Sequence, residues 1–215
     1  MIDLGKELTN FFSQHKKIRY KKRDIIVRSG GPLPGIYYIT KGFVKLSAIS
    51  RDGQELLLVI FKPGDTFPLA WALQSLENKY YLEAMTSVEL WQAPKEEFIA
   101  FIKRNPNTSF LLIQRLLIRL YGLLERMEYL VFGNAYQKIA SVIFLSVERF
   151  GEKEGESMSI PVPFTHKDIA SLVGVTRETA SIELKKLENK GIIAHTGKIF
   201  LVNDVEMLKK ESLFT

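Results

Sequence analysis

Two short helical patterns joined at one glycine restrict the fold of this chain more than any other feature. The patterns span residues 165–173 and 176–190. Thr165 opens the first pattern and Asp168 follows three residues later, which is the spacing of a reciprocal capping box. Gly174 stands where the first helix must end in a left-handed conformation. Two short helices joined by a tight glycine turn form a helix-turn-helix.

The second of these helices has one apolar face and one polar face. Thr176 is placed to cap its start and Gly191 to end it. At about 100° per residue, three apolar side chains share the face that should pack on the first helix. They are Ala180, Leu184 and Leu187. The opposite face holds Glu178, Ser181, Ile182 and Lys185, with Arg177 at its flank.

Such a helix can enter the major groove of DNA and place its N-terminal residues against base edges. Arg177 suits a guanine or a phosphate, and Glu178 suits the amino group of a cytosine. Four polar residues are better suited to phosphate contacts that set position, namely Thr165, Thr176, Ser181 and Lys185. The alternative interpretation is a helical hairpin inside some other kind of domain.

A β-hairpin is predicted directly after the second helix. Residues 192–195 and 199–202 flank Thr196-Gly197, which reads as a two-residue turn. This hairpin would form a wing beside the helices, with Lys198 against the DNA backbone. We interpret His195 as a solvated wing residue rather than a metal ligand.

A long amphipathic helix is predicted over residues 109–132. Six apolar residues follow steps of 4, 3, 4, 3 and 4, which is the heptad seam of a helix that pairs with another helix. They are Ile113, Leu117, Leu120, Leu124, Met127 and Val131. A second apolar row is suited to packing on the chain's own barrel; it consists of Leu112, Leu116, Leu123 and Leu130. Two rows indicate burial on both sides, so we expect a homodimer.

Short strands are predicted from about residue 20 to residue 98, before the long helix. Asp52-Gly53 is typical of a type I′ hairpin turn, and many strands at this spacing indicate an antiparallel barrel or roll.

Asn134 is a good helix cap after Gly133, and residues 151–156 read as a polar loop. The expected α+β fold has three parts. They are a β-roll sensor over 1–108, a dimerisation helix over 109–133, and a winged helix-turn-helix over 134–215.

Composition excludes several classes of site. The chain has no cysteine and three histidines, so disulfides, thiolate-bound iron–sulfur clusters and cysteine zinc sites are excluded, and no metal site is expected. The net charge is +6, yet residues 135–215 hold 11 basic and 11 acidic side chains. The excess lies earlier, notably at Lys16, Lys17, Arg19, Lys21, Lys22, Arg23 and Arg28. That run is either a solvated surface or an auxiliary contact to DNA or protein.

The chain resembles the Crp–Fnr family of bacterial regulators over essentially its full length. The resemblance is carried by Ile169-Ala170 to Gly174, Thr176-Arg177-Glu178-Thr179, Gly42-Phe43-Val44-Lys45, Asp52-Gly53-Gln54-Glu55 and Gly64-Asp65. It implies a cyclic-nucleotide-binding-like roll and base contacts by Arg177, Glu178 and Ile182. The third position is commonly arginine in the family. Isoleucine there implies an altered DNA site, because it can contact only apolar groups such as a thymine methyl.

The residues that bind cyclic nucleotide in some family members are replaced here. Pro68 and Leu69 stand where a Gly-Glu pair is expected, and no arginine lies in 78–81. We therefore expect neither cAMP nor cGMP, and haem is poorly supported. An unknown, less polar effector would lie near Leu69, Trp71, Tyr80, Tyr81 and Leu123. The alternative is that no effector exists and the aromatic residues belong to the roll core.

The leading hypothesis is a homodimeric transcription regulator that binds a two-fold symmetric site on double-stranded DNA. RNA polymerase is a further candidate partner. No apolar run is long enough to span a membrane, and the N-terminus does not resemble a secretory signal, so we expect a cytoplasmic protein. The competing class is a ligand-sensing module that controls a partner protein. An enzyme has no support, because no catalytic cluster, phosphate loop or metal-ligand spacing is present.

Overall fold

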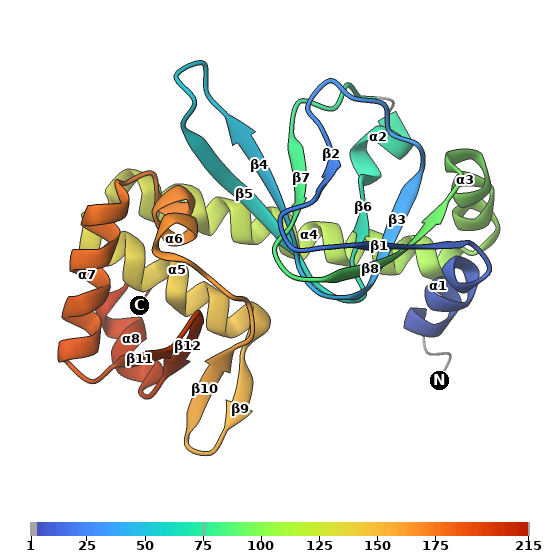
Figure 1. The fold of residues 1–215 in the computed structure, drawn as a ribbon. Helices are drawn as coiled ribbons and strands as arrows, with labels where there is room; N and C mark the ends of the chain where they lie inside the picture. The colour runs from blue at the N-terminus through green and yellow to red at the C-terminus, as the bar shows by residue number, and fades with distance from the viewer. Residues whose placement is uncertain (1–3, 75, 215) are drawn as a thin grey trace. The chain divides into compact units, whose positions relative to one another are not determined.

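The computed structural model describes residues 4–74 and 76–214, in two compact units divided between Ile118 and Arg119 (Figure 1). This division falls inside the longest helix, α4 (Pro106–Phe132). The three-part division by function, with junctions near residues 109 and 134, remains a prediction. Among the residues that the structure describes, none of the helices combines the length and the hydropathy of a membrane-spanning segment.

In its described residues, 4–74 and 76–118, the first unit is a roll of two antiparallel four-stranded sheets (Figure 1). One sheet has the order β1 (Lys16–Tyr20), β8 (Val88–Ala93), β3 (Ile36–Lys41) and β6 (Thr66–Phe67). The other has the order β2 (Ile25–Val27), β7 (Tyr81–Ala84), β4 (Val44–Ile49) and β5 (Glu55–Phe61). Alternate apolar residues of both sheets form one core that includes Ile39, Val44, Leu82 and Leu90. The predicted antiparallel roll is confirmed.

Three helices that the sequence patterns did not reveal complete the first unit. They are α1 (Leu4–Ser13), α2 (Leu69–Gln74) and α3 (Lys95–Arg104). With the start of α4, they contribute to a second apolar cluster on one side of the β3 and β8 strands. Its members are Leu8, Phe12, Ile36, Tyr38, Ala72, Ala93, Phe98 and Leu112.

The turn between β4 and β5 differs from the predicted type I′ geometry. That turn needs a positive φ at both central residues, but Gly53 has a φ of 78° and Asp52 is not among the positive-φ residues. The Ser50 carbonyl accepts from the Gly53 N–H at 3.0 Å, and the Ser50 N–H donates to the Gln54 carbonyl at 2.9 Å. The loop therefore has three residues and ends on a left-handed glycine.

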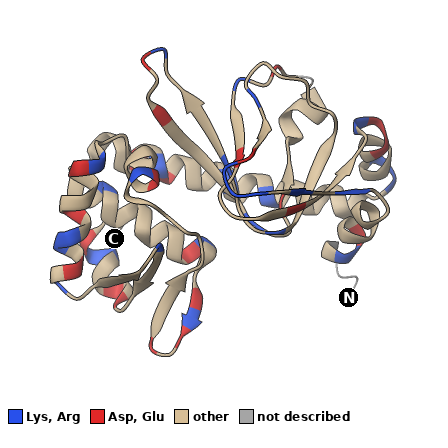
Figure 2. Ribbon diagram, viewed as in Figure 1, with Lys and Arg blue, Asp and Glu red and all other residues tan. Residues whose placement is uncertain are grey.

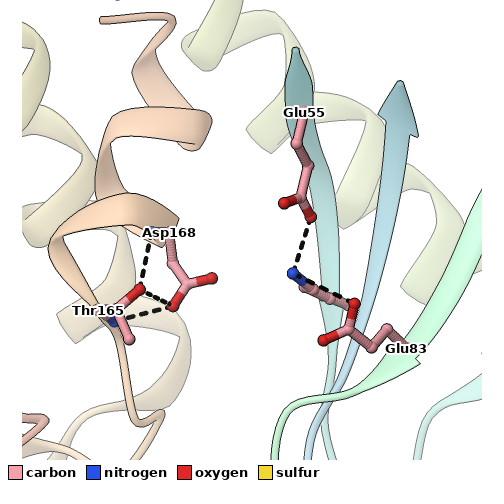
Figure 3. Close-up of polar contacts among 5 residues, drawn as sticks. Glu55, Glu83, Thr165 and Asp168 are labelled. Carbon is pink, nitrogen blue, oxygen red and sulfur yellow. Dashed lines mark hydrogen bonds and ion pairs between the residues drawn. The ribbon is translucent and has the colours of Figure 1, made fainter. Parts of the chain in front are cut away.

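A buried lysine links three strands of the second sheet. Lys45 on β4 is 8% exposed, and its Nζ lies 2.7 Å from Glu55 on β5 and 3.6 Å from Glu83 on β7 (Figure 3). A buried ammonium is tolerated where carboxylates pair with it, so the three residues depend on one another.

Over residues 119–214, the second unit holds four helices and one antiparallel sheet in addition to the end of α4. The helices are α5 (Ala135–Phe150), α6 (His166–Val173), α7 (Arg177–Asn189) and α8 (Val205–Glu211). The sheet has the order β11 (Ile193–Thr196), β12 (Ile199–Val202), β10 (Ser157–Ile160) and β9 (Glu152–Glu154).

Two details of this sheet correct the sequence prediction. Residues 152–160 form a β-hairpin, where a polar loop was expected over 151–156. In the wing, Thr196 pairs with Ile199, so the two-residue turn consists of Gly197 and Lys198 rather than Thr196-Gly197. The predicted cap at Asn134 is confirmed, because its side chain and that of Gln137 form a reciprocal capping box.

Helix α4 carries two opposed rows of residues. The inner row repeats every three or four residues, is buried or half-buried, and consists of Thr108, Leu112, Arg115, Arg119, Gly122, Arg126 and Tyr129. The seam lies roughly opposite at about 100° per residue. Its six members, predicted above, are each 50–72% exposed. Leu116 and Leu123, predicted to pack on the roll, are instead 56% and 40% exposed, and only Leu112 of their row joins the core.

Candidate nucleic-acid interface

The first helix of the helix-turn-helix begins and ends as its sequence predicts. Thr165 Oγ1 accepts from the Asp168 N–H at 3.1 Å, and the Asp168 carboxylate accepts from the Thr165 N–H at 2.8 Å (Figure 3). The helix ends at Gly174, whose φ of 69° and ψ of 38° are left-handed. The Gly174 and Val175 N–H groups both donate to the Ala170 carbonyl, which closes the turn.

Helix α7 is held against the rest of its unit by one apolar face. Thr176 caps its start, accepting from the Thr179 N–H at 3.1 Å. The three apolar residues predicted to face inward, Ala180, Leu184 and Leu187, are at most 1% exposed. Their burial fixes the rotation of the helix about its axis, and so determines which residues face outward.

The outward face of α7 carries the predicted base-contacting residues. Arg177, Glu178 and Lys185 are exposed, and Ile182 is 59% exposed. Ser181 is half-buried, and its hydroxyl donates to the Arg177 carbonyl at 2.9 Å. The structure therefore brings the three predicted base contacts together on one accessible surface at the start of the helix.

The charges of α7 are balanced within the unit. Figure 2 shows basic and acidic residues interleaved along this helix. Each lysine here has a carboxylate partner: Lys185 pairs with Glu188 at 3.1 Å, Lys186 with Glu183 at 2.7 Å, and Lys190 with Glu211 at 2.7 Å. In the part of the chain that the structure describes, exposed Arg177 and Lys198 have no such partner. These two cations are therefore the best placed to meet phosphate.

A polar network that was not foreseen joins α6, α7 and the wing. His166 Nδ1 lies 2.7 Å from Ser181 Oγ, and His195 Nδ1 contacts the Glu188 carboxylate. The two imidazole rings meet edge to face with centroids 6.1 Å apart. Burial acts to raise the pKa of Glu188, but hydrogen bonds from Lys185 and His195 outweigh it and hold that pKa below its ordinary value. Of these contacts, only the pair of Lys185 and Glu188, three positions apart on one helix, follows from a spacing in the sequence.

The stability of this network should depend on pH through His166. Burial lowers the pKa of its imidazole below the ordinary value, and His195 and Arg177 lower it further against the opposing effect of Glu188. The unfolded chain therefore takes up this proton at a higher pH than the folded chain does. The contribution of neutral His166 to folding is complete above about pH 6.5 and decreases as the pH falls below that value.

We expect NMR titration of His166 to give a midpoint below about 6.5, the ordinary value for histidine, and the second unit to lose stability on acidification through that window. His166→Gln should remove this part of the loss, because glutamine does not titrate. A midpoint above the ordinary histidine value would contradict the assignment.

Comparison with known proteins agrees with both halves of this architecture. Residues 17–105 match the family model of the cyclic nucleotide-binding domain, and residues 137–211 match that of the Crp-like helix-turn-helix domain. The chain is 26% identical to the CRP-like cAMP-activated global transcriptional regulator of Mycobacterium tuberculosis, over 93% of this chain and 89% of that protein. The chain belongs to the Crp–Fnr family.

Further relatives of this Crp–Fnr regulator cover nearly its full length. The global nitrogen regulator of Nostoc sp. is 26% identical, over 89% of this chain and 87% of that protein. The solved structure of a CRP/FNR-family transcriptional regulator from Thermus thermophilus is 27% identical. It covers 92% of this chain and 98% of that one with a TM-score of 0.70. The family consists of DNA-binding transcription regulators rather than enzymes.

The residues of the predicted effector pocket lie on three elements. Leu69 and Trp71 lie on α2, Tyr81 is the first residue of β7 with Tyr80 directly before it, and Leu123 lies on α4. Trp71 packs against both core clusters of the first unit, and Lys95 Nζ lies 4.7 Å from the centre of its ring. Tyr80 is 41% exposed. Packing explains Trp71 as a core residue, and the pocket itself remains a prediction.

Proposed function

We propose that this Crp–Fnr regulator acts as a homodimer and inserts α7 of each copy into the major groove of a two-fold symmetric DNA site. The observation that carries the proposal is the division of α7 into a fully buried apolar face and an exposed face that bears Arg177, Glu178 and Ile182. Two such helices related by symmetry would read half-sites about one helical turn apart. RNA polymerase is a further proposed partner.

The proposed dimer interface is the seam of α4. Its six side chains are at least half exposed in the single chain and follow a heptad spacing along the helix. A contiguous apolar row of this length is unfavourable in water. A second copy would cover it with the same row, since a two-fold axis pairs each surface with itself.

The proposed contacts to bases and to phosphates have different physical bases. Arg177 and Glu178 offer a donor and an acceptor to base edges, and Ile182 offers only an apolar surface. The phosphate contacts are assigned to Thr165, Thr176, Ser181, Lys185 and Lys198. Of these, the Thr165 and Ser181 hydroxyls already donate within the chain, to Asp168 and to the Arg177 carbonyl, and Lys185 already pairs with Glu188. Each would exchange that bond for one to DNA.

We further propose that the roll does not bind a cyclic nucleotide. Such a ligand needs a cation for its phosphate and amide donors around it. Pro68 has no N–H at one expected position, and Leu69 offers no hydrogen-bonding side chain. The segment that would supply the cation is a turn held by Asn78, whose side-chain amide donates to the carbonyls of Arg28 and Tyr80 at 2.9 Å. These residues do not fit the ligand, so titration calorimetry with cAMP should show no binding.

Two alanine variants test the proposed roles on DNA. Glu178→Ala should change the preferred base at one position of each half-site, because its carboxylate selects among base edges. Lys185→Ala should weaken binding to every sequence by a similar factor and reduce the slope of log affinity against log salt by about one per subunit. Both effects can be measured by fluorescence anisotropy on a panel of single-base variants. If the two variants weaken all sequences equally, the assignment of roles is wrong.

A further inference from the structure

A buried arginine connects the proposed dimer helix with the helix-turn-helix. Arg126 lies on the inner row of α4 and is 8% exposed. Its Nη2 group donates to the backbone carbonyl of Leu172 at 2.6 Å. Leu172 is the residue before the last of α6, so this contact sits directly before the turn that leads into α7. Both residues belong to the second unit.

The chemistry of a helix end explains why a guanidinium suits this position. The last four carbonyls of a helix have no partner within it, and they carry the negative end of the helix dipole. The Gly174 and Val175 N–H groups both donate to the Ala170 carbonyl. The Leu172 carbonyl therefore accepts its hydrogen bond from a donor outside the helix. Arg126 thus supplies both a donor and a positive charge to the end of α6.

One aromatic contact and one close approach of the chain also involve the end of α4. Tyr129 is 1% exposed, and its ring meets Phe214 edge to face at 6.3 Å between centroids. A Cβ on Gly133 would lie 2.7 Å from the Tyr129 carbonyl oxygen and 2.8 Å from a methyl group of Leu213. Gly133 therefore permits a close approach of the chain's C-terminal residues. The end of α4 is thus held to the rest of the second unit at Arg126 and Tyr129, and Gly133 directly after it leaves room for Leu213.

Arg126 and the proposed dimer seam lie on different sides of the same helix, α4. The inner row lies roughly opposite the seam, and Met127 of the seam is the next residue in the chain. One rigid helix would thus meet its partner copy on one side and hold the turn before α7 on the other. We infer that Arg126 is a positioning residue that transmits the geometry of the dimer helix to α7, and so fixes the spacing between DNA half-sites. This inference rests on the proposed function.

The same helix offers a matched control for a test. Arg115 also lies on the inner row, and its Nη1 group donates to the backbone carbonyl of Gly64 at 2.7 Å. Both Arg115 and Gly64 belong to the first unit. Arg115→Met removes the same kind of bond from the same helix without touching the helix-turn-helix.

The experiment measures half-site spacing with the full-length protein. Wild type first selects an operator from random DNA, and affinities are then measured for that operator and for versions with one base pair added or removed between half-sites. We expect wild type to bind the altered spacings about tenfold or more weakly than the selected operator. A tenfold change is the scale of one charge-assisted hydrogen bond, such as the bond from Arg126 to the Leu172 carbonyl that holds the turn before α7. Arg126→Met should lose most of this discrimination, and Arg115→Met should retain it.

Two readouts separate positioning from DNA contact and from general destabilisation. Base preference within a half-site and the salt slope should be unchanged in Arg126→Met, because the buried guanidinium does not reach DNA. If Arg126→Met does not fold, Arg126→Gln replaces it, since glutamine is polar but too short to reach the Leu172 carbonyl. Full wild-type discrimination in a folded Arg126 variant would overturn the inference. No specific binding by wild type would overturn the proposed function instead.

Discussion

Leu120→Lys is expected to convert the protein into monomers and to reduce its affinity for a two-half-site operator by about 100-fold or more, because binding then loses its second contact. Leu120 is 51% exposed in the single chain and lies in the middle of the seam. A two-fold interface would bring two added ammonium groups together in an apolar environment, where unpaired charges are strongly unfavourable. Sedimentation velocity measures the oligomeric state, and fluorescence anisotropy measures the affinity.

Gln114→Lys is the matched control for this prediction. Gln114 is exposed on the same helix but lies outside the seam, so the same charge is added without entering the proposed interface. This variant should remain dimeric and bind DNA as wild type does. An unchanged dimer in Leu120→Lys would place the interface on another surface.

Lys45→Met is expected to lower the free energy of unfolding of the first unit by about 3 kcal/mol, the usual scale for removing one partner from a buried ion pair. Methionine fills a similar volume, but it leaves Glu55 and Glu83 without the ammonium that both contact. Both tryptophans of the chain, Trp71 and Trp91, lie in this unit. Urea denaturation followed by tryptophan fluorescence therefore reports on this unit alone.

Lys17→Met provides the comparison, because it removes a lysine from an exposed ion pair. Lys17 pairs with Glu89 at 2.5 Å, and its side chain is 46% exposed. Arg19 remains at 3.0 Å from the same carboxylate. Exposed pairs contribute about 0–1 kcal/mol, so little change is expected. Equal losses in the two lysine variants would show that burial of Lys45 is not what makes its ion pairs important.

The helix-turn-helix could be predicted in detail because its signals are local. The capping box of Thr165 and Asp168 and the left-handed Gly174 join residues at most a few positions apart. The buried face of α7 follows from helical periodicity alone. The seam of α4 was found in the same way, and its outward direction agrees with the exposure of all six residues. The identity of its partner remains a proposal.

The features that sequence reasoning missed depend on contacts between distant residues. Arg126 and Leu172 are 46 positions apart in the sequence. His15 contacts Glu97, and this contact, like those of His166 and His195, does not follow from any sequence spacing. The apolar character of Leu116 and Leu123 predicts that they pack on the roll, but both are exposed. The covered side of α4 instead includes Arg115 and Arg126, whose guanidinium groups donate to backbone carbonyls. Periodicity in the sequence shows which residues share one side of a helix. Which side is buried depends on the elements that pack against the helix.

The central claim is that two copies of α7 read a symmetric DNA site through the face that begins at Arg177. Selection of bound fragments from random double-stranded DNA by the full-length protein tests it most directly. We predict an enriched motif of two inverted half-sites about one helical turn apart, with at least one position in each half-site lost in Glu178→Ala. Recovery of no enriched motif, even at low salt, would contradict the claim and favour a module that acts on a partner protein.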